Sequence, residues 1–314
     1  MASTYVSLAE LMLKQQVADR GVYMSMIQSD SIANQMMWDT TPTGLYTYKQ
    51  LDSLPAATFR SLNETGTVKF AQPKTKSGDV KILNFDSAID EKVIQRTGNR
   101  AGEIAAQMMI MNRSMMSTAE YYMIHGDNIG TAGAEEFDGW QVIAERNSAT
   151  VSAGDNGGAL ALDDFKSMIE MARQCAGGDS SRMNIWMNST HNYKLWTLLM
   201  ASATSGVRWT VDQAGNQVEM FDGVKINILR KDAAGNTFLP FTETQGSSDV
   251  ASSIYCTVKS TGIGVPGVFM VQDGAPAFKT VETGIGMTLH ADWGLDQNES
   301  HDYAVVRYKG ILNS

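Results

Sequence analysis

The chain has 314 residues, of which 43% are hydrophobic and 19% charged, and its formal net charge at pH 7 is −9. This length allows one large domain or two ordinary ones, and the apolar content excludes an intrinsically disordered chain. The acidic balance argues against a protein whose main task is to bind nucleic acid, because binding phosphate needs an excess of Lys and Arg. The acidic charge does not exclude a protein that forms a container around nucleic acid.

The cysteines and histidines form no metal-binding or disulfide pattern. Cys175 and Cys256 lie far from each other in sequence, and none of the four histidines has the spacing of a zinc helix, so we expect neither a disulfide framework nor a zinc site. The start of the chain has no signal-peptide pattern. The longest apolar run falls far short of the roughly 20 residues that a membrane helix needs, so we expect synthesis in a cytoplasm and no membrane contact.

Residues 1–55 combine a short helical signal with irregular chain. Ser7 and Glu10 have the spacing of a capping box. Further on, apolar residues such as Met24, Met36 and Trp38 follow no clean period. A long irregular apolar stretch is hard to bury against itself, so we expect an arm that lies on another surface.

Residues 56–94 read as short strands around turns. Residues 57–62 and 67–70 are predicted strands, residues 74–79 a polar tip, and residues 80–85 a further strand. Five basic and two acidic residues lie between positions 60 and 81, whereas 14 basic and 24 acidic residues lie from position 101 onward. A solvated hairpin and a projecting hairpin that contacts an acidic surface of a neighbouring copy both fit this charge.

Residues 98–125 carry the strongest helical pattern. The apolar residues recur at alternating spacings of four and three, which predicts one buried helix face; they are Ile104, Met108, Met111, Met115, Ala119 and Tyr122. At about 1.5 Å per residue the helix would be about 40 Å long, and Gly126 is placed to end it. Methionine at helical spacing favours packing over metal binding.

The remainder alternates short helices and strands. A short strand is expected at 141–144, a helix with an Asp cap from Leu162 to Gly177, a strand at 185–187 and a helix capped by Ser189 and Thr190. From there strands dominate, and the best candidates are residues 221–229, 253–258, 268–271 and 303–308.

Catalytic patterns are weak throughout. The sequence has no nucleophile elbow and no P-loop. Gly262, Gly264 and Gly267 match the dinucleotide fingerprint, which requires a helix to begin in the glycine loop. Because Pro266 lies inside the loop and a strand-like run follows, a tight turn between two strands is the favoured interpretation.

The order of these elements resembles that of the major capsid proteins of tailed bacteriophages, which have the Hong Kong 97-type fold. Residues 57–64 and 68–70 resemble the extended loop of this family, residues 98–125 its spine helix, residues 137–140 its Asp-Gly step, residues 160–165 the start of its next helix, residues 185–188 and 221–226 its axial domain, and residues 301–307 its returning strand. The resemblance covers nearly the whole chain and rests on order and spacing.

The resemblance implies an α+β chain with five parts: an N-terminal arm (1–55), an extended β-hairpin loop (56–94), a peripheral domain (95–177) with spine helix 98–125, an axial domain (178–285), and a C-terminal strand (286–314) that returns to the peripheral domain. Its implied function is self-assembly into hexamers and pentamers of an icosahedral shell. That shell would enclose double-stranded DNA without sequence-specific binding, with no catalytic residue, cofactor or metal.

The same resemblance implies partners and a location. Because the sequence begins almost at the arm, a scaffold would be a separate protein or a piece removed earlier; a portal and a decoration protein are further expected partners. The protein would assemble in the host bacterial cytoplasm and reside in the virion.

Two sets of residues carry the expected contacts. Subunits would contact each other through the extended loop, at Arg60, Glu64, Lys69, Lys74 and Lys76. The spine helix would pack through Ile104, Met108, Met111, Met115 and Tyr122.

Two alternatives stay open at this point. One is an encapsulin-type nanocompartment shell protein, which is similar in fold and encloses enzyme cargo. The other is a nucleotide-binding enzyme that uses the loop from Gly262 to Gly267.

Overall fold

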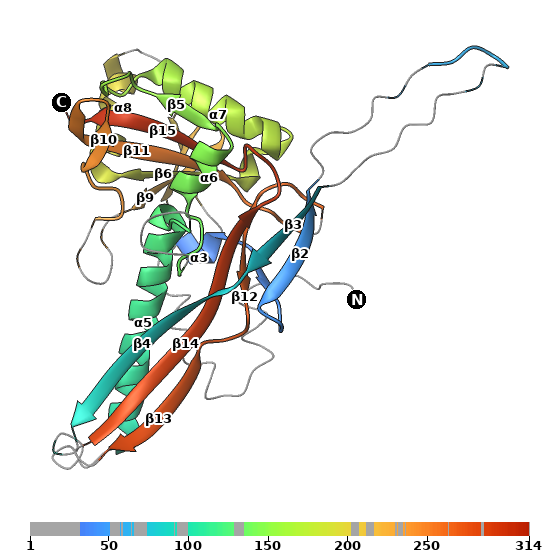
Figure 1. Cartoon of the computed structure of the whole chain (residues 1–314). Coiled ribbons are helices and arrows are strands. Elements are labelled where there is room, and N and C mark those ends of the chain that lie inside the picture. Colours follow the sequence, from blue (N-terminus) through green and yellow to red (C-terminus); the bar gives the residue numbers. More distant parts are fainter. Residues whose placement is uncertain are drawn as a thin grey trace.

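The structure is a computed structural model. It describes residues 32–50, 57, 59–63, 65, 74–90, 92, 100–128, 135–201, 207–211, 217–229, 231, 235, 237–262, 264–283 and 286–313. Figure 1 shows an elongated part, in which one long helix runs beside long strands, and a second part built on another sheet.

The elongated part is a five-stranded sheet with a long helix along it. The strands are β1 (Trp38–Thr40), β4 (Lys81–Asp90), β12 (Val268–Gln272), β13 (Ala277–Thr283) and β14 (Gly286–Glu299), and the helix is α5 (Arg100–His125). β4 pairs with one edge of β14, while β13 and β12 follow one another along the other edge, all antiparallel. β1 joins β12 in parallel.

The helix α5 occupies almost the range predicted from the apolar spacing. Met111 and Met115 are fully buried, whereas Ile104, Met108 and Tyr122 are partly buried and pack against the core. The helix ends before Gly126, whose N–H donates to the carbonyl of Tyr122 at 2.8 Å. A Cβ at this position would overlap the Phe137 carbonyl, so the close return of the chain requires glycine.

The second part is an eight-stranded sheet. Its strands follow the order β5 (Thr150–Ser152), β15 (Val305–Leu312), β11 (Ser248–Val258), β6 (Met183–Asn188), β9 (Val224–Leu229), β8 (Gln217–Phe221) and β7 (Val207–Val211), with β10 (Glu243–Gln245) paired to β11. Three helices pack against it: α6 (Trp140–Arg146), α7 (Leu162–Ala176) and α8 (Ser189–Ala201).

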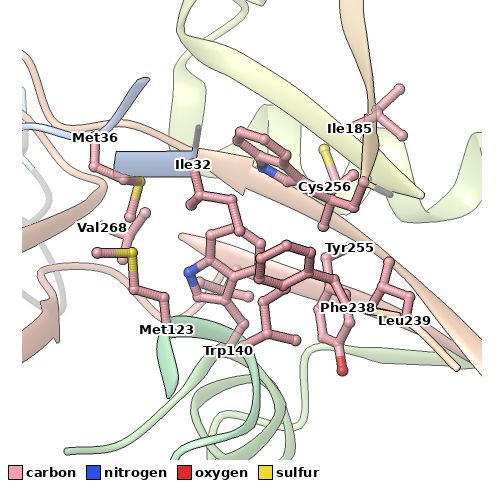
Figure 2. Close-up of a cluster of buried hydrophobic side chains, with 14 of the residues drawn as sticks. Ile32, Met36, Met123, Trp140, Ile185, Phe238, Leu239, Tyr255, Cys256 and Val268 are labelled. Carbon is pink, nitrogen blue, oxygen red and sulfur yellow. The ribbon is translucent and has the colours of Figure 1, made fainter. Parts of the chain in front are cut away.

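The two parts share one hydrophobic core. Figure 2 shows Ile32, Met123, Trp140 and Tyr255 in a single cluster, although they come from four different elements. The Trp140 ring lies 5.4 Å from that of Trp186 and 5.9 Å from that of Tyr255. Burial of these large rings is a main source of stability at the junction.

The N-terminal segment departs from the sequence-based expectation. Residues 32–40 form the short helix α3 (Ile32–Gln35) and strand β1, and Ile32, Met36 and Trp38 are buried in the core of their own subunit. The prediction of an irregular arm on another surface is therefore wrong for these residues. The predicted capping box at Ser7 lies outside the described residues.

Three local predictions are corrected. The run 141–144 is helical, not a strand, because Trp140, Ile143 and Ala144 are buried at helical spacing in α6. The helix α7 begins after Ala161 without a side-chain cap. The expected strand 221–229 is two strands, β8 and β9, which are separated by a turn at Asp222, where φ is 52°.

Several other predicted elements are confirmed. α7 ends at Gly177, which has a φ of 63°, and α8 begins at Ser189 as expected. The side chain of Asn188, not that of Ser189, accepts the His191 N–H at 2.8 Å, so the last residue of β6 caps this helix.

The expected grouping of the C-terminal half also differs from the structure. The sequence division assigned α7 to the same domain (95–177) as α5, whereas α7 packs against β11 and β15 of the eight-stranded sheet. Within 286–314, β14 runs along α5, and β15 belongs to the other sheet. Long-range strand pairing, which local sequence does not encode, decides this arrangement.

Candidate inter-subunit loop and its anchor

A two-stranded antiparallel ribbon carries a segment whose described residues are all exposed. The ribbon consists of β2 (Leu45–Gln50) and β3 (Lys74–Asp79), with Leu45 opposite Asp79 and Gln50 opposite Lys74. Residues 51–73 connect the two strands; we call their described residues, 57, 59–63 and 65, the projecting loop. The described tip of this loop, coloured blue in Figure 1, lies far from both sheets.

Two large apolar side chains are uncovered at this tip. Phe59 is 108% exposed and Leu62 is 94% exposed. Residues 57 and 59–61 have no regular structure, and residues 62 and 63 form a turn, so the strand predicted at 57–62 is wrong for the described residues. Two exposed large apolar side chains so close in sequence suit a surface that another molecule covers.

The structure separates the predicted loop residues into three groups. Arg60 and Lys74 are exposed. Lys76 is half-buried and bound inside its own subunit, where its Nζ donates to Glu299 Oε1 at 2.9 Å. Glu64 and Lys69 lie outside the described side chains. Residues 74–79, expected to be a polar tip, are instead the strand β3 at the base of the loop.

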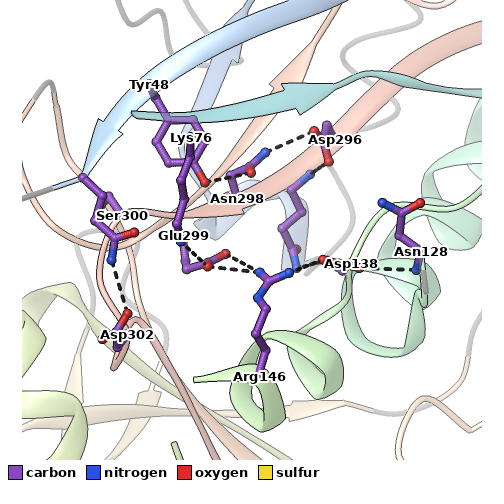
Figure 3. A network of polar contacts seen from close by, with 12 residues as sticks. Tyr48, Lys76, Asn128, Asp138, Arg146, Asp296, Asn298, Glu299, Ser300 and Asp302 are labelled. Carbon is purple, nitrogen blue, oxygen red and sulfur yellow. Dashed lines mark hydrogen bonds and ion pairs between the residues drawn. The ribbon is translucent and has the colours of Figure 1, made fainter. Parts of the chain in front are cut away.

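An ion-pair network holds this base to the body of the subunit. The Glu299 carboxylate, only 1% exposed, also accepts from Arg146 Nη2 at 3.0 Å with both oxygens, and Arg146 Nη1 pairs with Asp138. Figure 3 shows the chain of contacts from Lys76 through Glu299 and Arg146 to Asp138. Although burial opposes its charge, the two carboxylates raise the pKa of Arg146.

Two tyrosines of β2 form a second set of anchors. The Tyr46 hydroxyl donates to Asp296 Oδ2 at 2.7 Å, and the Tyr48 hydroxyl donates to Asn298 Oδ1 at 3.0 Å. Burial and the nearby Asp296 carboxylate raise the pKa of Tyr46 well above its ordinary value, and burial raises the pKa of Asp296. Both groups therefore keep their protons more firmly than they would in water.

Glycine at position 78 makes the first of these bonds possible. Gly78 lies opposite Tyr46 in the ribbon, and a Cβ at Gly78 would overlap the Tyr46 ring. The ring can therefore cross β3 and reach Asp296. Beyond it, Gln50 Nε2 donates to Asp302 Oδ1 at 3.2 Å, which adds an anchor at the loop end of β2.

Sequence reasoning missed these anchors. The alternation of Tyr46 and Tyr48 indicates a strand face, and the polar run from Asp296 to Glu299 is unusual inside a buried strand. Neither pattern shows that the tyrosines bind Asp296 and Asn298, because the residues of each pair are 250 positions apart in the sequence.

The glycine-rich loop that matched the dinucleotide fingerprint joins β11 to β12. Val265 N–H donates to the Gly262 carbonyl at 3.1 Å, and Gly264 has a φ of 80°. A strand, not a helix, follows Gly267, so the N-terminal helix dipole that would bind a pyrophosphate is not provided by this loop.

Among the residues that the structure describes, no three His, Cys, Asp or Glu side chains gather closely enough to hold a metal ion. None of the described helices is long and apolar enough to cross a membrane.

Comparison of the sequence with protein-family models and with curated proteins gave no match. Comparison of the structure with solved structures gave many matches. An encapsulin complex from Synechococcus elongatus PCC 7942 matches with a TM-score of 0.62 and 10% identity over 88% of this chain and 85% of that one. Microbacterium phage Oxtober96 matches with a TM-score of 0.58 and 13% identity over 89% and 91% of the two chains.

A third match is the capsid of a native GTA particle, with a TM-score of 0.56 and 11% identity over 90% of both chains. Two of these three matches, the encapsulin and the GTA capsid, are shell proteins by name. The matches span nearly the whole chain, so the chain has the α+β Hong Kong 97-type capsid fold of tailed-phage major capsid proteins.

Proposed function

We propose that this chain is the major capsid protein of a tailed bacteriophage. Many copies form the hexamers and pentamers of an icosahedral shell, which encloses double-stranded DNA without reading its sequence. The proposal rests on one observation, namely that the projecting loop has an anchored base and an exposed apolar tip. Its base is bonded to the body at Lys76, Tyr46 and Tyr48, while its apolar tip is left uncovered by its own chain.

The tip has the chemistry of an inter-subunit contact. Phe59 and Leu62 supply apolar area and Arg60 supplies positive charge at the tip, while Lys74 adds an exposed positive charge at the base of the loop. We propose that these residues, with Glu64 and Lys69, contact an acidic surface of a neighbouring copy. Each contact is small, but contacts repeated around a closed shell sum to a stable particle.

The proposal includes partners and a location. A separate scaffolding protein and a portal would act during assembly in the host bacterial cytoplasm, and a decoration protein is a further candidate partner. The mature protein would reside in the virion. The phage and GTA capsids among the structural matches support this location.

Electron microscopy of the purified protein tests the shell function. Expressed alone or with a neighbouring scaffold gene, the wild-type chain should form closed shells. The double variant Phe59→Ser and Leu62→Ser should remain an unassembled subunit with the same circular dichroism spectrum and melting temperature. A wild-type protein that stays monomeric in both settings would contradict the proposal.

An encapsulin-type shell is the second candidate, and the encapsulin match supports it. The contents of particles isolated from the native host separate the two functions. Nuclease-protected DNA of genome length indicates a phage head, whereas a single abundant enzyme in the lumen indicates a compartment. A terminase and a portal gene beside this one would also favour the phage.

The nucleotide-binding enzyme is not proposed further. Its one supporting feature, the loop from Gly262 to Gly267, leads into the strand β12.

A further inference from the structure

Glu299 is the meeting point of three elements that are far apart in the sequence. It is the last residue of β14, and its carboxylate accepts from Lys76 of β3 and from Arg146 of α6. The helix α6 in turn packs against β15 of the eight-stranded sheet. One buried carboxylate therefore links the base of the projecting loop, the long sheet and the second sheet (Figure 3).

The charges at this junction are balanced. Lys76 and Arg146 carry two positive charges, and Glu299 and Asp138 carry two negative ones. A buried ion pair adds little net stability compared with an apolar core, because removing charges from water is costly. Such groups contribute more to the choice of one geometry, since a displaced partner leaves a buried charge uncompensated.

The tyrosine anchors do not duplicate this role. Tyr46 and Tyr48 bind Asp296 and Asn298 of β14, and the Tyr48 ring also packs edge-on against Phe269 of β12, so they hold the ribbon against the five-stranded sheet. Lys76 lies directly opposite Tyr48 in the ribbon, and through Glu299 it is the anchor that reaches Arg146 and α6. The remaining anchor, Gln50, binds Asp302 between β14 and β15, so Glu299 is the contact among these anchors that ties the direction of the ribbon to α6.

We propose that Glu299 is a positioning residue that fixes the direction in which the projecting loop leaves the subunit. Its consequence for the shell rests on the proposed function: a loop of fixed direction places its tip on the neighbouring copy at one angle, which gives shells of uniform size. Loss of the carboxylate allows the ribbon to take more than one direction.

A distance measurement on the unassembled subunit tests the direction itself. Nitroxide labels on Thr75→Cys in β3 and Ser167→Cys in α7, both exposed positions, report the distance between ribbon and second sheet by pulsed electron paramagnetic resonance. The native thiols of Cys175 and Cys256 are 2% and 0% exposed, so the labels react with the introduced pair. In the labelled chain that carries no further substitution, we expect a single narrow distribution of distances between the two labels.

Glu299→Gln should broaden this distribution or add a second distance. The matched control is Glu170→Gln, which removes a carboxylate from an exposed ion pair with Arg173 on α7 and should leave the distance unchanged. If Glu299→Gln does not fold, Lys76→Gln replaces it, because this side chain is partly exposed and its loss leaves the Glu299–Arg146 pair intact. A wild-type distance in every folded variant, with or without a lower melting temperature, would overturn the inference.

Particle size is the second readout. Shells of Glu299→Gln should vary in diameter or fail to close, while shells of Glu170→Gln should match those of the wild type. If the wild-type chain forms no shells, the proposed function fails, and the distance measurement still decides the role of Glu299. If Glu299→Gln forms uniform shells and keeps one distance, the positioning role is wrong and the proposed function stands.

Discussion

The indole of Trp38 stacks on that of Trp293, with ring centroids 5.6 Å apart and an angle of 13° between the planes. Trp38 Nε1 also donates to the Ala33 carbonyl at 2.9 Å, and Trp293 Nε1 donates to the Gly274 carbonyl at 3.1 Å. The stack thus joins the N-terminal strand β1 to the long strand β14. Residues 32–40 are part of the folded core and not a detachable arm.

Replacing Trp38 tests this integration. Trp38→Ala should lower the free energy of unfolding by about 3–5 kcal/mol, the usual cost of removing a buried aromatic ring, and Trp38→Phe should cost less because it keeps part of the stack. Urea unfolding of the unassembled subunit measures both. Tyr193→Ala, at a side chain that is 74% exposed, is the control and should change stability by less than about 0.5 kcal/mol. An equally small effect of Trp38→Ala would show that β1 is not part of the cooperative core.

The contrast between α5 and the ribbon shows what sequence can and cannot predict here. The helix was predictable because Met108, Met111 and Met115 repeat over several turns, and a long periodic pattern is a local signal. The short helix α6 was mistaken for a strand because seven residues give too few repeats to distinguish the two periods.

The anchors of the loop were not predictable for a different reason. The sequence predicts that Lys76 contacts a neighbouring subunit, yet its ion-pair partner in the structure is Glu299 of the same chain, 223 positions away. Pairing at that separation depends on the whole topology, and local charge counts do not contain it. The fold class was recoverable from element order, whereas the partners within the candidate site required the structure.

Lys74 and Lys76 should behave differently despite their closeness in sequence. Lys76→Glu places a second carboxylate beside the buried Glu299, so it should lower the free energy of unfolding by about 3–5 kcal/mol, as expected for breaking a buried pair. Lys74→Glu changes an exposed side chain and should leave subunit stability within about 0.5 kcal/mol while impairing shell assembly.

Urea unfolding and electron microscopy of the same preparations separate these outcomes. Normal shells from Lys74→Glu would remove Lys74 from the inter-subunit contact. Unchanged unfolding of Lys76→Glu would mean that the ion pair with Glu299 does not form in solution.

The bond between Tyr46 and Asp296 should give a pH-dependent contribution to stability. The bond stabilises the ionised carboxylate. It therefore lowers the pKa of Asp296, whereas burial, the larger effect, raises that pKa. Tyr46→Phe should therefore cost about 1.5–3 kcal/mol, the range for a hydrogen bond to a charged group, at a pH where Asp296 is ionised. The cost should shrink as the pH falls through the folded-state pKa of Asp296, because the protonated carboxyl accepts a weaker bond.

Tyr48→Phe is the matched control for this prediction. Its hydroxyl donates to the neutral amide of Asn298 at 3.0 Å, so its loss should cost about 0.5–1.5 kcal/mol with no such change across the acid range. Urea unfolding of both variants between neutral and acid pH makes the comparison. Parallel pH profiles for the two variants would contradict the charge-assisted bond at Tyr46.

The buried His191 should make the subunit less stable in mild acid. Its ring is 0% exposed and lies edge-on to Phe241 at 5.1 Å, and neither ring nitrogen has a hydrogen-bond partner among the described residues. Burial, with a smaller contribution from Lys194, lowers its pKa from 6.5 to about 3. The folded state thus binds fewer protons than the unfolded state between these values, and stability falls as the pH drops from about 6.5 toward 3, by up to about 1.4 kcal/mol per pH unit.

His191→Phe removes this titration while keeping a ring against Phe241. Its free energy of unfolding should fall less steeply than that of the wild type between pH 6 and pH 4, and at pH 7 it should be no less stable, since the unpartnered ring nitrogens are gone. Urea unfolding at several pH values measures the two slopes. A direct check is the His191 ring resonance in NMR, which should not titrate between pH 8 and pH 5 because the folded ring stays neutral there. Equal slopes, or a ring that titrates near pH 6.5, would mean that His191 is reached by water in solution.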